Sequence, residues 1–97
     1  MNKNPTYLTQ GPKTAYRVIE GEAVIVDLES SMLYSLNSVA TFVWEMSDGR
    51  TPIEKIVDKI CEEFEVERGL AKKDCLEFVQ DFADKALLVI KEKPGSL

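Results

Sequence analysis

Alternation of polar and apolar residues predicts a series of short strands in the first third of the chain. Residues 14–19, 23–28 and 32–36 are rich in β-branched, aromatic and other apolar side chains, which is typical of strands. Two short polar segments, Glu20-Gly21-Glu22 and Glu29-Ser30-Ser31, separate them and have the composition of turns. The spacing predicts a three-stranded antiparallel meander.

The two-residue period of a strand also assigns side chains to the faces of this predicted sheet. Alternate apolar residues on the second and third strands form two sets that we expect to face the core. Ile25 and Leu33 then point to the opposite face, where we interpret them as tolerated surface residues. The residues expected in the core are Val24, Val26 and Leu28 on the second strand and Met32, Tyr34 and Leu36 on the third.

After residue 37 the apolar period changes to that of a helix. Val39, Phe42, Val43 and Met46 recur at the spacing of one buried stripe. Either Asn37 or Ser38 can cap the start of this first helix, because both types of side chain accept a hydrogen bond from a backbone N–H. The turn at Asp48-Gly49 is expected to end it.

Two more helices and a final strand are predicted after this turn. Thr51 can cap the second helix, Pro52 suits its first position, and Glu54 would complete a capping box. The third helix is expected to begin at Glu67 or Gly69 and to end at Lys85. Residues 87–90 have the composition of a short strand that could lie beside the helices.

The two flanks of the third predicted helix differ in polarity. The flank beside Val79 is the more apolar, whereas the other has the composition of a solvated surface. The apolar flank could be peripheral core or could meet a ligand, and the residues leave both alternatives open. It comprises Lys72, Leu76 and Ala83, and the polar flank comprises Asp74, Asp81 and Lys85.

Length and composition are those of one small globular domain. The chain has 97 residues, of which 44% are hydrophobic and 30% charged. We expect residues 1–12 to form a flexible N-terminal segment because they are polar and include Pro5, Gly11 and Pro12. Residues 13–93 would form the folded domain, and residues 94–97 a tail. The apolar runs are too short for a membrane span or a signal region, which favours a cytoplasmic protein without membrane contact.

Composition argues against several kinds of chemistry. The chain has no histidine, and we interpret its two cysteines, Cys61 and Cys75, as reduced core residues. Neither a catalytic residue set nor a metal or cofactor site is predicted, so an enzyme that acts alone is not expected. The net charge of -5 also disfavours nucleic acid, since phosphate binding relies on lysine and arginine. The chain is therefore expected to act by binding another molecule.

The predicted order of strands and helices gives an α+β, winged-helix-like fold. A closer resemblance is to the PqqD family, which includes protein D of pyrroloquinoline quinone biosynthesis and related RiPP recognition elements. It rests on the Leu36-Asn37 entry into the first helix, the Asp48-Gly49-Arg50-Thr51 turn and the segment Ala86-Leu87-Leu88-Val89. The resemblance covers about residues 15–90.

This resemblance implies a peptide chaperone without catalytic activity. Such domains bind the leader segment of a ribosomally made precursor peptide and present it to a modifying enzyme, often a radical-SAM protein. The leader would add as a strand beside the third strand and pack on the third helix; the domain would be a monomer or a weak dimer. The peptide-binding residues implied are Leu33, Tyr34, Ser35 and Leu36 in the strand, Leu76, Val79 and Ala83 in the cleft, and Lys72 and Lys73 at its rim.

Two alternatives remain open on the sequence. The quinone-pathway protein itself usually carries a Pro- and Arg-bearing segment before its first strand and an acidic residue where this chain has Asn37. These departures favour another peptide-modifying system. A winged-helix DNA-binding regulator would need a basic third helix, but acidic residues outnumber basic ones there. Glu67, Asp74, Glu77, Asp81 and Asp84 stand against Arg68, Lys72, Lys73 and Lys85.

Overall fold

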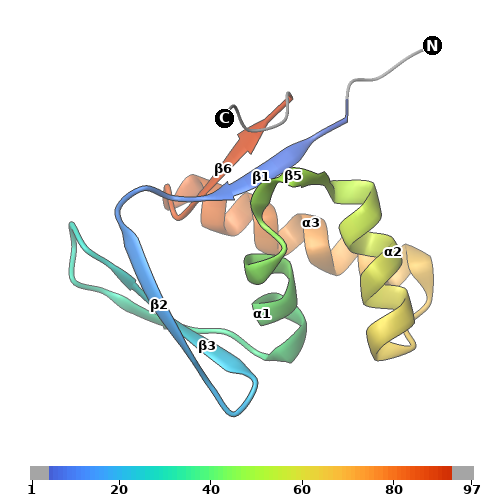
Figure 1. Cartoon of the computed structure of the whole chain (residues 1–97), viewed down its shortest axis with the longest axis horizontal. Helices are drawn as coiled ribbons and strands as arrows, with labels where there is room; N and C mark the ends of the chain where they lie inside the picture. Colours follow the sequence, from blue (N-terminus) through green and yellow to red (C-terminus); the bar gives the residue numbers. More distant parts are fainter. Residues whose placement is uncertain (1–4, 93–97) are drawn as a thin grey trace.

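A computed structural model describes residues 5–92 of the chain. This part contains two three-stranded sheets and three helices (Figure 1). One sheet has the strand order β2-β3-β4, and the other has the order β5-β1-β6. In chain order the elements are β1 (Tyr7–Gln10), β2 (Thr14–Ile19), β3 (Glu22–Asp27), β4 (Leu33–Ser35), α1 (Ser38–Glu45), β5 (Asp48–Pro52), α2 (Ile53–Phe64), α3 (Arg68–Asp84) and β6 (Leu88–Lys91).

The β2-β3-β4 sheet confirms the predicted antiparallel meander. β2 and β3 pair in one continuous register and are joined by a two-residue turn. Glu20 and Gly21 in this turn have φ angles of 52° and 82°, the left-handed conformation that tight hairpin turns require. β4 pairs with the other side of β3 through Leu33, Tyr34 and Ser35. β2 and β4 are therefore the two edges of this sheet.

The faces of β3 are the reverse of those predicted. Ala23 and Ile25 are fully buried, whereas Val24 and Val26 lie on the opposite, partly exposed face. Residues 23–26 are all apolar, so alternation could not choose between the two faces. Ala23 and Ile25 instead belong to the core cluster together with Val43 and Trp44 of α1, and the Ala23 N–H donates a hydrogen bond to Thr41 Oγ1 of this helix at 2.8 Å.

Residues around the turn between β3 and β4 also differ from expectation. Leu28 and Met32, both predicted to face the core, are 59% and 53% exposed. They flank the turn and lie outside both strands, where the two-residue period no longer applies. Tyr34 packs against the core and Leu36 is buried, as predicted.

The three helices occur close to the predicted positions. Asn37 is the N-cap of α1, and its side chain accepts a hydrogen bond from the Ala40 N–H at 2.8 Å. The predicted capping box of α2 is wrong: Pro52 occupies the N-cap position, and Thr51 donates from its hydroxyl to Asp48. The Glu54 side chain instead pairs with Arg68 of α3.

Two segments that were not predicted to be strands, residues 7–10 and 48–52, belong to a second sheet, β5-β1-β6. β1 lies within the segment expected to be flexible, but it pairs with β5 on one side and β6 on the other. Leu8 of β1 is fully buried. β5 covers the segment predicted as a turn and helix start, and β6, which was predicted as a final strand, pairs with β1. Residues 1–4 and 93–97, which include the predicted tail, lie outside the described part.

Gly11, between β1 and β2, lies where two backbone segments approach each other closely. Its N–H donates to the Leu87 carbonyl at 2.8 Å, which ties the end of β1 to the start of β6. A Cβ at this position would lie only 2.6 Å from the Ala86 carbonyl oxygen. Glycine is therefore required by the close approach of the two backbones.

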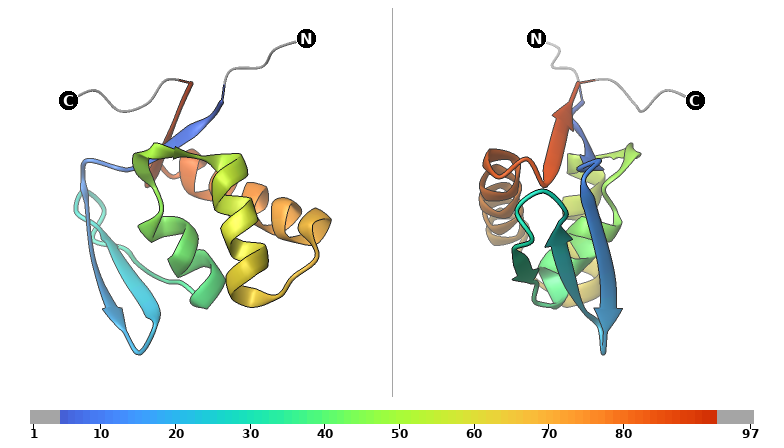
Figure 2. Two further views of the ribbon diagram at one scale, coloured as in Figure 1. Left: turned by 45° about the vertical axis from the view of Figure 1, so that its right-hand side comes forward. Right: turned by 90° about the vertical axis from the view of Figure 1, so that its left-hand side faces the viewer.

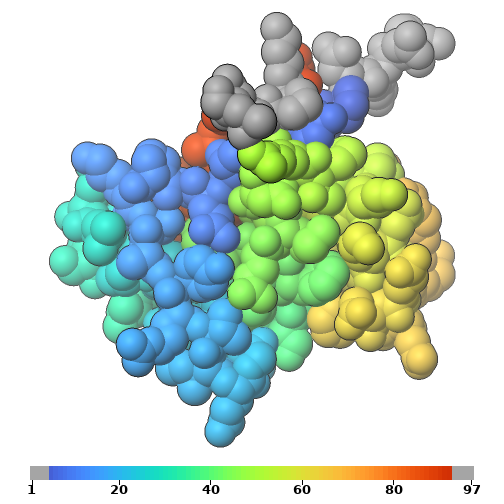
Figure 3. Space-filling view, in the orientation of Figure 1, coloured from blue at the N-terminus to red at the C-terminus, as the bar shows by residue number. Residues whose placement is uncertain are grey.

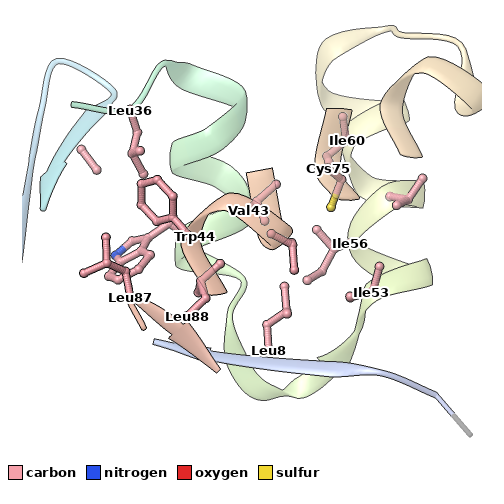
Figure 4. Packing of buried hydrophobic residues seen from close by; sticks show 14 of the residues in the cluster. Leu8, Leu36, Val43, Trp44, Ile53, Ile56, Ile60, Cys75, Leu87 and Leu88 are labelled. Atoms are coloured by element: carbon pink, nitrogen blue, oxygen red, sulfur yellow. The ribbon is translucent and has the colours of Figure 1, made fainter. Parts of the chain in front are cut away.

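One core unites the two sheets and the helices (Figure 4). Trp44 of α1 is fully buried and packs edge-on against Phe82 of α3 and Tyr16 of β2, with ring centroids 6.5 and 5.6 Å away. Leu8 and Leu88 bring side chains of the second sheet into the same cluster. Within residues 5–92, no helix is long and apolar enough to cross a membrane.

Candidate functional site

The free edge of β4 carries backbone groups that have no partner strand. The Asp27 N–H donates to the Met32 carbonyl and the Leu36 N–H donates to the Ala23 carbonyl, so even-numbered residues of this segment face β3. In an antiparallel pair, alternate residues direct their N–H and C=O groups to opposite sides. The N–H and C=O groups of Leu33 and Ser35 therefore point away from β3. Such an edge can pair with another extended chain.

This edge lies on the α3 side of the sheet. In the right-hand view of Figure 2, β4 is the short strand between β3 and α3. The Tyr34 ring packs against Phe82 of α3, with centroids 5.8 Å apart, and Phe78 packs on Phe82 at 4.4 Å. β4 and the Phe78 side of α3 therefore face each other.

A groove continues from the end of β4 between α1 and α3. Its volume is about 430 Å³. The floor is apolar and includes Val43, Ile60 and Cys75, whereas polar and charged side chains stand along its rim. The lining residues are Asn37, Val39, Ala40, Val43, Ile60, Val66, Ala71, Asp74, Cys75, Glu77, Phe78 and Asp81.

The rim of this groove is acidic along α3. Asp74, Glu77 and Asp81 recur at the spacing of one helix face. Two of them are paired with lysines of the same helix region, Glu77 with Lys73 at 3.7 Å and Asp81 with Lys85 at 2.5 Å. The hydrogen bond to Asp81 raises the pKa of Lys85 above its ordinary value. Asp74 forms no ion pair within residues 5–92.

The side chains predicted to line the cleft lie on the other flank of α3. Leu76, Val79 and Lys72 border a second groove of about 830 Å³, together with Ile53 and Ile90 from outside α3. Lys72 pairs with Glu54 of α2 at 3.1 Å. This groove includes none of the residues Leu33–Leu36, and a role of Leu76, Val79 and Lys72 in peptide binding stays a prediction.

Three further predicted residues can be placed. Ala83 is half-buried on the Leu76 flank of α3, while Lys73 is exposed beside Glu77, next to the acidic rim. Leu36 is buried and so belongs to the core more than to the edge. None of the predicted residues lines the groove itself: Leu33, Tyr34 and Ser35 form β4, which precedes it in the chain, and Lys73 pairs with Glu77 on its rim.

The sequence contains a signal for the Phe78 flank of α3. Phe78 belongs by its spacing to the core face of α3, but it lies at the border of that face beside the acidic residues and lines the groove. The Leu76 flank was considered as the ligand-facing one on the sequence because it is the more apolar of the two. Once β1 forms a sheet with β5 and β6, the Leu76 flank lies on the side of that sheet, away from β4.

Cys75, the cysteine that lines the groove, is not a reactive thiol. Cys75 is buried in the groove floor, and burial raises the pKa of its thiol to about 11. Thiols with a raised pKa stay protonated at neutral pH and are weak nucleophiles. Among residues 5–92, no group of three or more histidine, cysteine or acidic side chains could hold a metal ion.

Comparison with known proteins places this geometry in a family. A family model described as coenzyme PQQ synthesis protein D (PqqD) matches residues 22–88. A search of curated proteins found no significant match. Among solved structures, TbiB1 in complex with the TbiA(beta) leader peptide is 28% identical, with a TM-score of 0.76, and the match covers 82% of this chain and 93% of that chain.

A second solved structure has the same fold. Lasso peptide synthetase B1 complexed with the leader peptide is 22% identical and has a TM-score of 0.71, with 84% of this chain and 96% of that chain covered. The family model spans both β3 and β4, all three helices and the start of β6. The chain belongs to the PqqD family.

Proposed function

We propose that this domain binds the leader segment of a ribosomally made precursor peptide by strand addition to β4. The observation that carries the proposal is the free backbone edge of Leu33 and Ser35 in β4, with a groove beside α3 that begins at Asn37, just after this strand. Backbone hydrogen bonds would hold the peptide in register, and side-chain contacts in the groove would select its sequence. The complex of the similar protein TbiB1 with the TbiA(beta) leader peptide supports this proposal.

The two sides of an added strand would meet different surroundings. Side chains alternate between the faces of a strand, so every second leader residue would point toward α3 and the intervening residues would point to solvent. The inward residues would contact Tyr34, Phe78 and the apolar floor of the groove. We therefore expect at least one large apolar leader residue to occupy the groove.

The acidic rim of the groove indicates which charge the leader should carry next to its apolar residue. Asp74, Glu77 and Asp81 line one rim, and the whole chain carries a net charge of -5. Opposite charges across an interface accelerate association and fix register more than they add affinity. A leader with lysine or arginine next to its apolar anchor would fit this rim best, and its affinity would fall moderately with added salt.

The bound leader would then be presented to a modifying enzyme such as a radical-SAM protein. In this proposal the domain contributes binding, and the enzyme contributes the chemistry. The pathway could be that of pyrroloquinoline quinone, but Asn37 and the missing Pro- and Arg-bearing segment favour another modified peptide. The DNA-binding alternative gains no support, because the exposed flank of α3 beside the groove is acidic.

A proline substitution at the β4 edge tests the proposal. Ser35→Pro removes an N–H that points away from β3, so it should leave the β3–β4 pairing intact while blocking one leader hydrogen bond. Ser35→Ala keeps that N–H and is the matched control. Calorimetric titration with a leader peptide that the wild-type domain binds should show binding lost or weakened at least about tenfold for Ser35→Pro only. Equal affinity of both variants, each folded by circular dichroism, would contradict strand addition at β4.

A further inference from the structure

The second edge of the same sheet is β2, and its backbone is open as well. The two-residue turn between β2 and β3 makes Ile19 and Glu22 a hydrogen-bonded pair, so alternate residues of β2 face away from β3. The Leu28 N–H donates to the Lys13 carbonyl at 2.9 Å, which agrees with this alternation. The N–H and C=O groups that point outward are those of Thr14, Tyr16 and Val18.

β2 lacks the features that usually protect an edge strand. It is six residues long, contains no proline and pairs with β3 without a bulge. Five of its six residues are exposed, including Tyr16 at 41% and Val18 at 38%. Its one charged residue is Arg17. In the space-filling view of Figure 3 the surface around β2 is uncovered at the margin of the molecule. Long, flat, apolar edges of this kind favour pairing with another strand.

The sequence of β2 is complementary to itself in one antiparallel register. Two copies of β2 would pair through their outward-facing backbone groups, so an outward-facing residue of one copy must lie opposite an outward-facing residue of the other. This requirement permits a register with Tyr16 opposite Tyr16 and Thr14 opposite Val18. This register puts Arg17 opposite the small Ala15 and brings no like charges together. Aromatic pairs and β-branched pairs directly across two strands are stabilising.

The neighbouring registers are less favourable because of Arg17. A shift by two residues in one direction puts Arg17 opposite Arg17 of the other copy. The same shift in the other direction puts Arg17 opposite Lys13. Like charges directly opposite each other destabilise a pair of strands. Charge therefore selects the register centred on Tyr16.

We propose that two copies of this chain associate through their β2 edges into a symmetric dimer with one continuous six-stranded sheet. The β4 edges then lie at the two ends of that sheet, and both remain open to a peptide. A single pair of short strands buries less area than a standard stable interface, so the dimer forms at high protein concentration and dissociates on dilution. This inference does not depend on leader binding.

Sedimentation velocity over a wide range of protein concentration tests the proposal. The wild-type chain should shift reversibly from monomer to dimer as its concentration rises. Tyr16→Glu and Tyr16→Lys each put like charges on the two-fold axis and should stay monomeric. An equimolar mixture of the two variants should regain the dimer, because opposite charges then meet at the axis. A wild-type chain that stays monomeric at millimolar concentration would overturn the proposal.

Tyr16 also packs against Trp44, so its substitution changes the core as well as the edge. Two further variants therefore test the edge alone. Val18→Pro removes an outward N–H of β2 without breaking a β2–β3 hydrogen bond, and it should abolish the dimer. Ser35→Pro alters the opposite edge and should leave the dimer unchanged. Fluorescence of the single tryptophan, Trp44, checks that each variant is folded. Loss of the dimer in Ser35→Pro but not in Val18→Pro would assign association to β4 and refute the β2 interface.

Discussion

The two flanks of α3 face different parts of the fold and differ in charge. The Phe78 flank faces β4 and α1, and its rim carries Asp74, Glu77 and Asp81. The Leu76 flank lies on the side of the second sheet, where its charged groups, Lys72 and Glu54, are paired with each other. The more apolar flank is thus not the one beside the open strand edge.

This difference shows that apolar character alone does not identify a binding surface. The Leu76 flank is apolar partly because it lies next to the core that β1, β5 and β6 complete. The Phe78 flank combines an aromatic side chain, a groove and an edge strand with free backbone groups. Peptide recognition by strand addition needs that combination, since the backbone supplies register and the groove supplies selectivity.

The largest expected effect concerns the sheet beside the Leu76 flank. Leu8→Ala should destabilise the fold by about 2–5 kcal/mol, the usual cost of truncating a buried leucine, because Leu8 is fully buried. Leu76→Ala is the matched control and should cost less than about 1 kcal/mol, because Leu76 is 42% exposed. Urea denaturation measures both. Equal, small losses would mean that β1 does not form part of the core.

A second prediction separates the two flanks by peptide affinity. Phe78→Ala should weaken leader binding by at least about 1 kcal/mol, as expected for an aromatic contact in a binding groove. Leu76→Ala should leave affinity unchanged, because Leu76 borders the other groove. Isothermal titration with the same leader peptide compares the two variants. A larger loss in Leu76→Ala would move the peptide to the Leu76 flank.

A third prediction concerns the acidic rim. Asp74→Asn should reduce affinity for a basic leader by about 0.2–1 kcal/mol and should lessen the dependence on salt, as expected for an exposed charge. Glu92→Gln changes the net charge equally but lies beyond β6, away from the groove, and should have little effect. Affinities measured at two salt concentrations give the comparison. The same salt dependence in both variants would attribute it to net charge rather than to the rim.

The smallest expected effect is the pH dependence contributed by the Leu76 flank. Hydrogen bonds from Arg68 and Lys72 lower the pKa of Glu54 below its ordinary value of 4.5. A carboxyl whose pKa is lower in the folded state stabilises the fold above its unfolded pKa, and this contribution is lost as the pH falls through the folded pKa. Because the ion pairs of Glu54 with Arg68 and Lys72 are exposed, this contribution to the free energy of unfolding should be about 0.5 kcal/mol or less.

Glu54→Gln tests this contribution by denaturation at neutral and acidic pH. The variant should be slightly less stable than the wild type at neutral pH, and the two should converge in acid. A constant difference at every pH would show that the carboxylate charge of Glu54 is not responsible.

Local pattern predicted much of the fold, and long-range pairing limited the rest. The β2-β3-β4 meander and the Asn37 cap follow from short segments whose turns and periods are characteristic. β1 could not be recognised in the same way, because a four-residue strand gains its stability from β5 and β6, which are distant in sequence. The faces of β3 were equally undetermined, since Val24 and Ile25 are both good core residues.

The candidate site was predictable in its strand but not in its helix flank. The β4 edge follows from the meander and the family resemblance together. The choice between the Leu76 and Phe78 flanks depends on which of them faces β4. That orientation could not be judged without the β5-β1-β6 sheet, which the sequence did not predict. Because Tyr7–Gln10 were expected to be flexible, the position of the Leu76 flank beside a second sheet was not predicted.

Amide hydrogen exchange of β4 tests the central claim most directly. Leu33 and Ser35 direct their N–H groups away from β3, whereas the N–H of Leu36 is already bonded to the Ala23 carbonyl at 2.8 Å. When the leader peptide saturates the domain, exchange of the Leu33 and Ser35 amides should slow markedly, while the Leu36 amide should change little. Unchanged exchange at Leu33 and Ser35, with protection appearing instead along β6 or β5, would contradict strand addition at this edge.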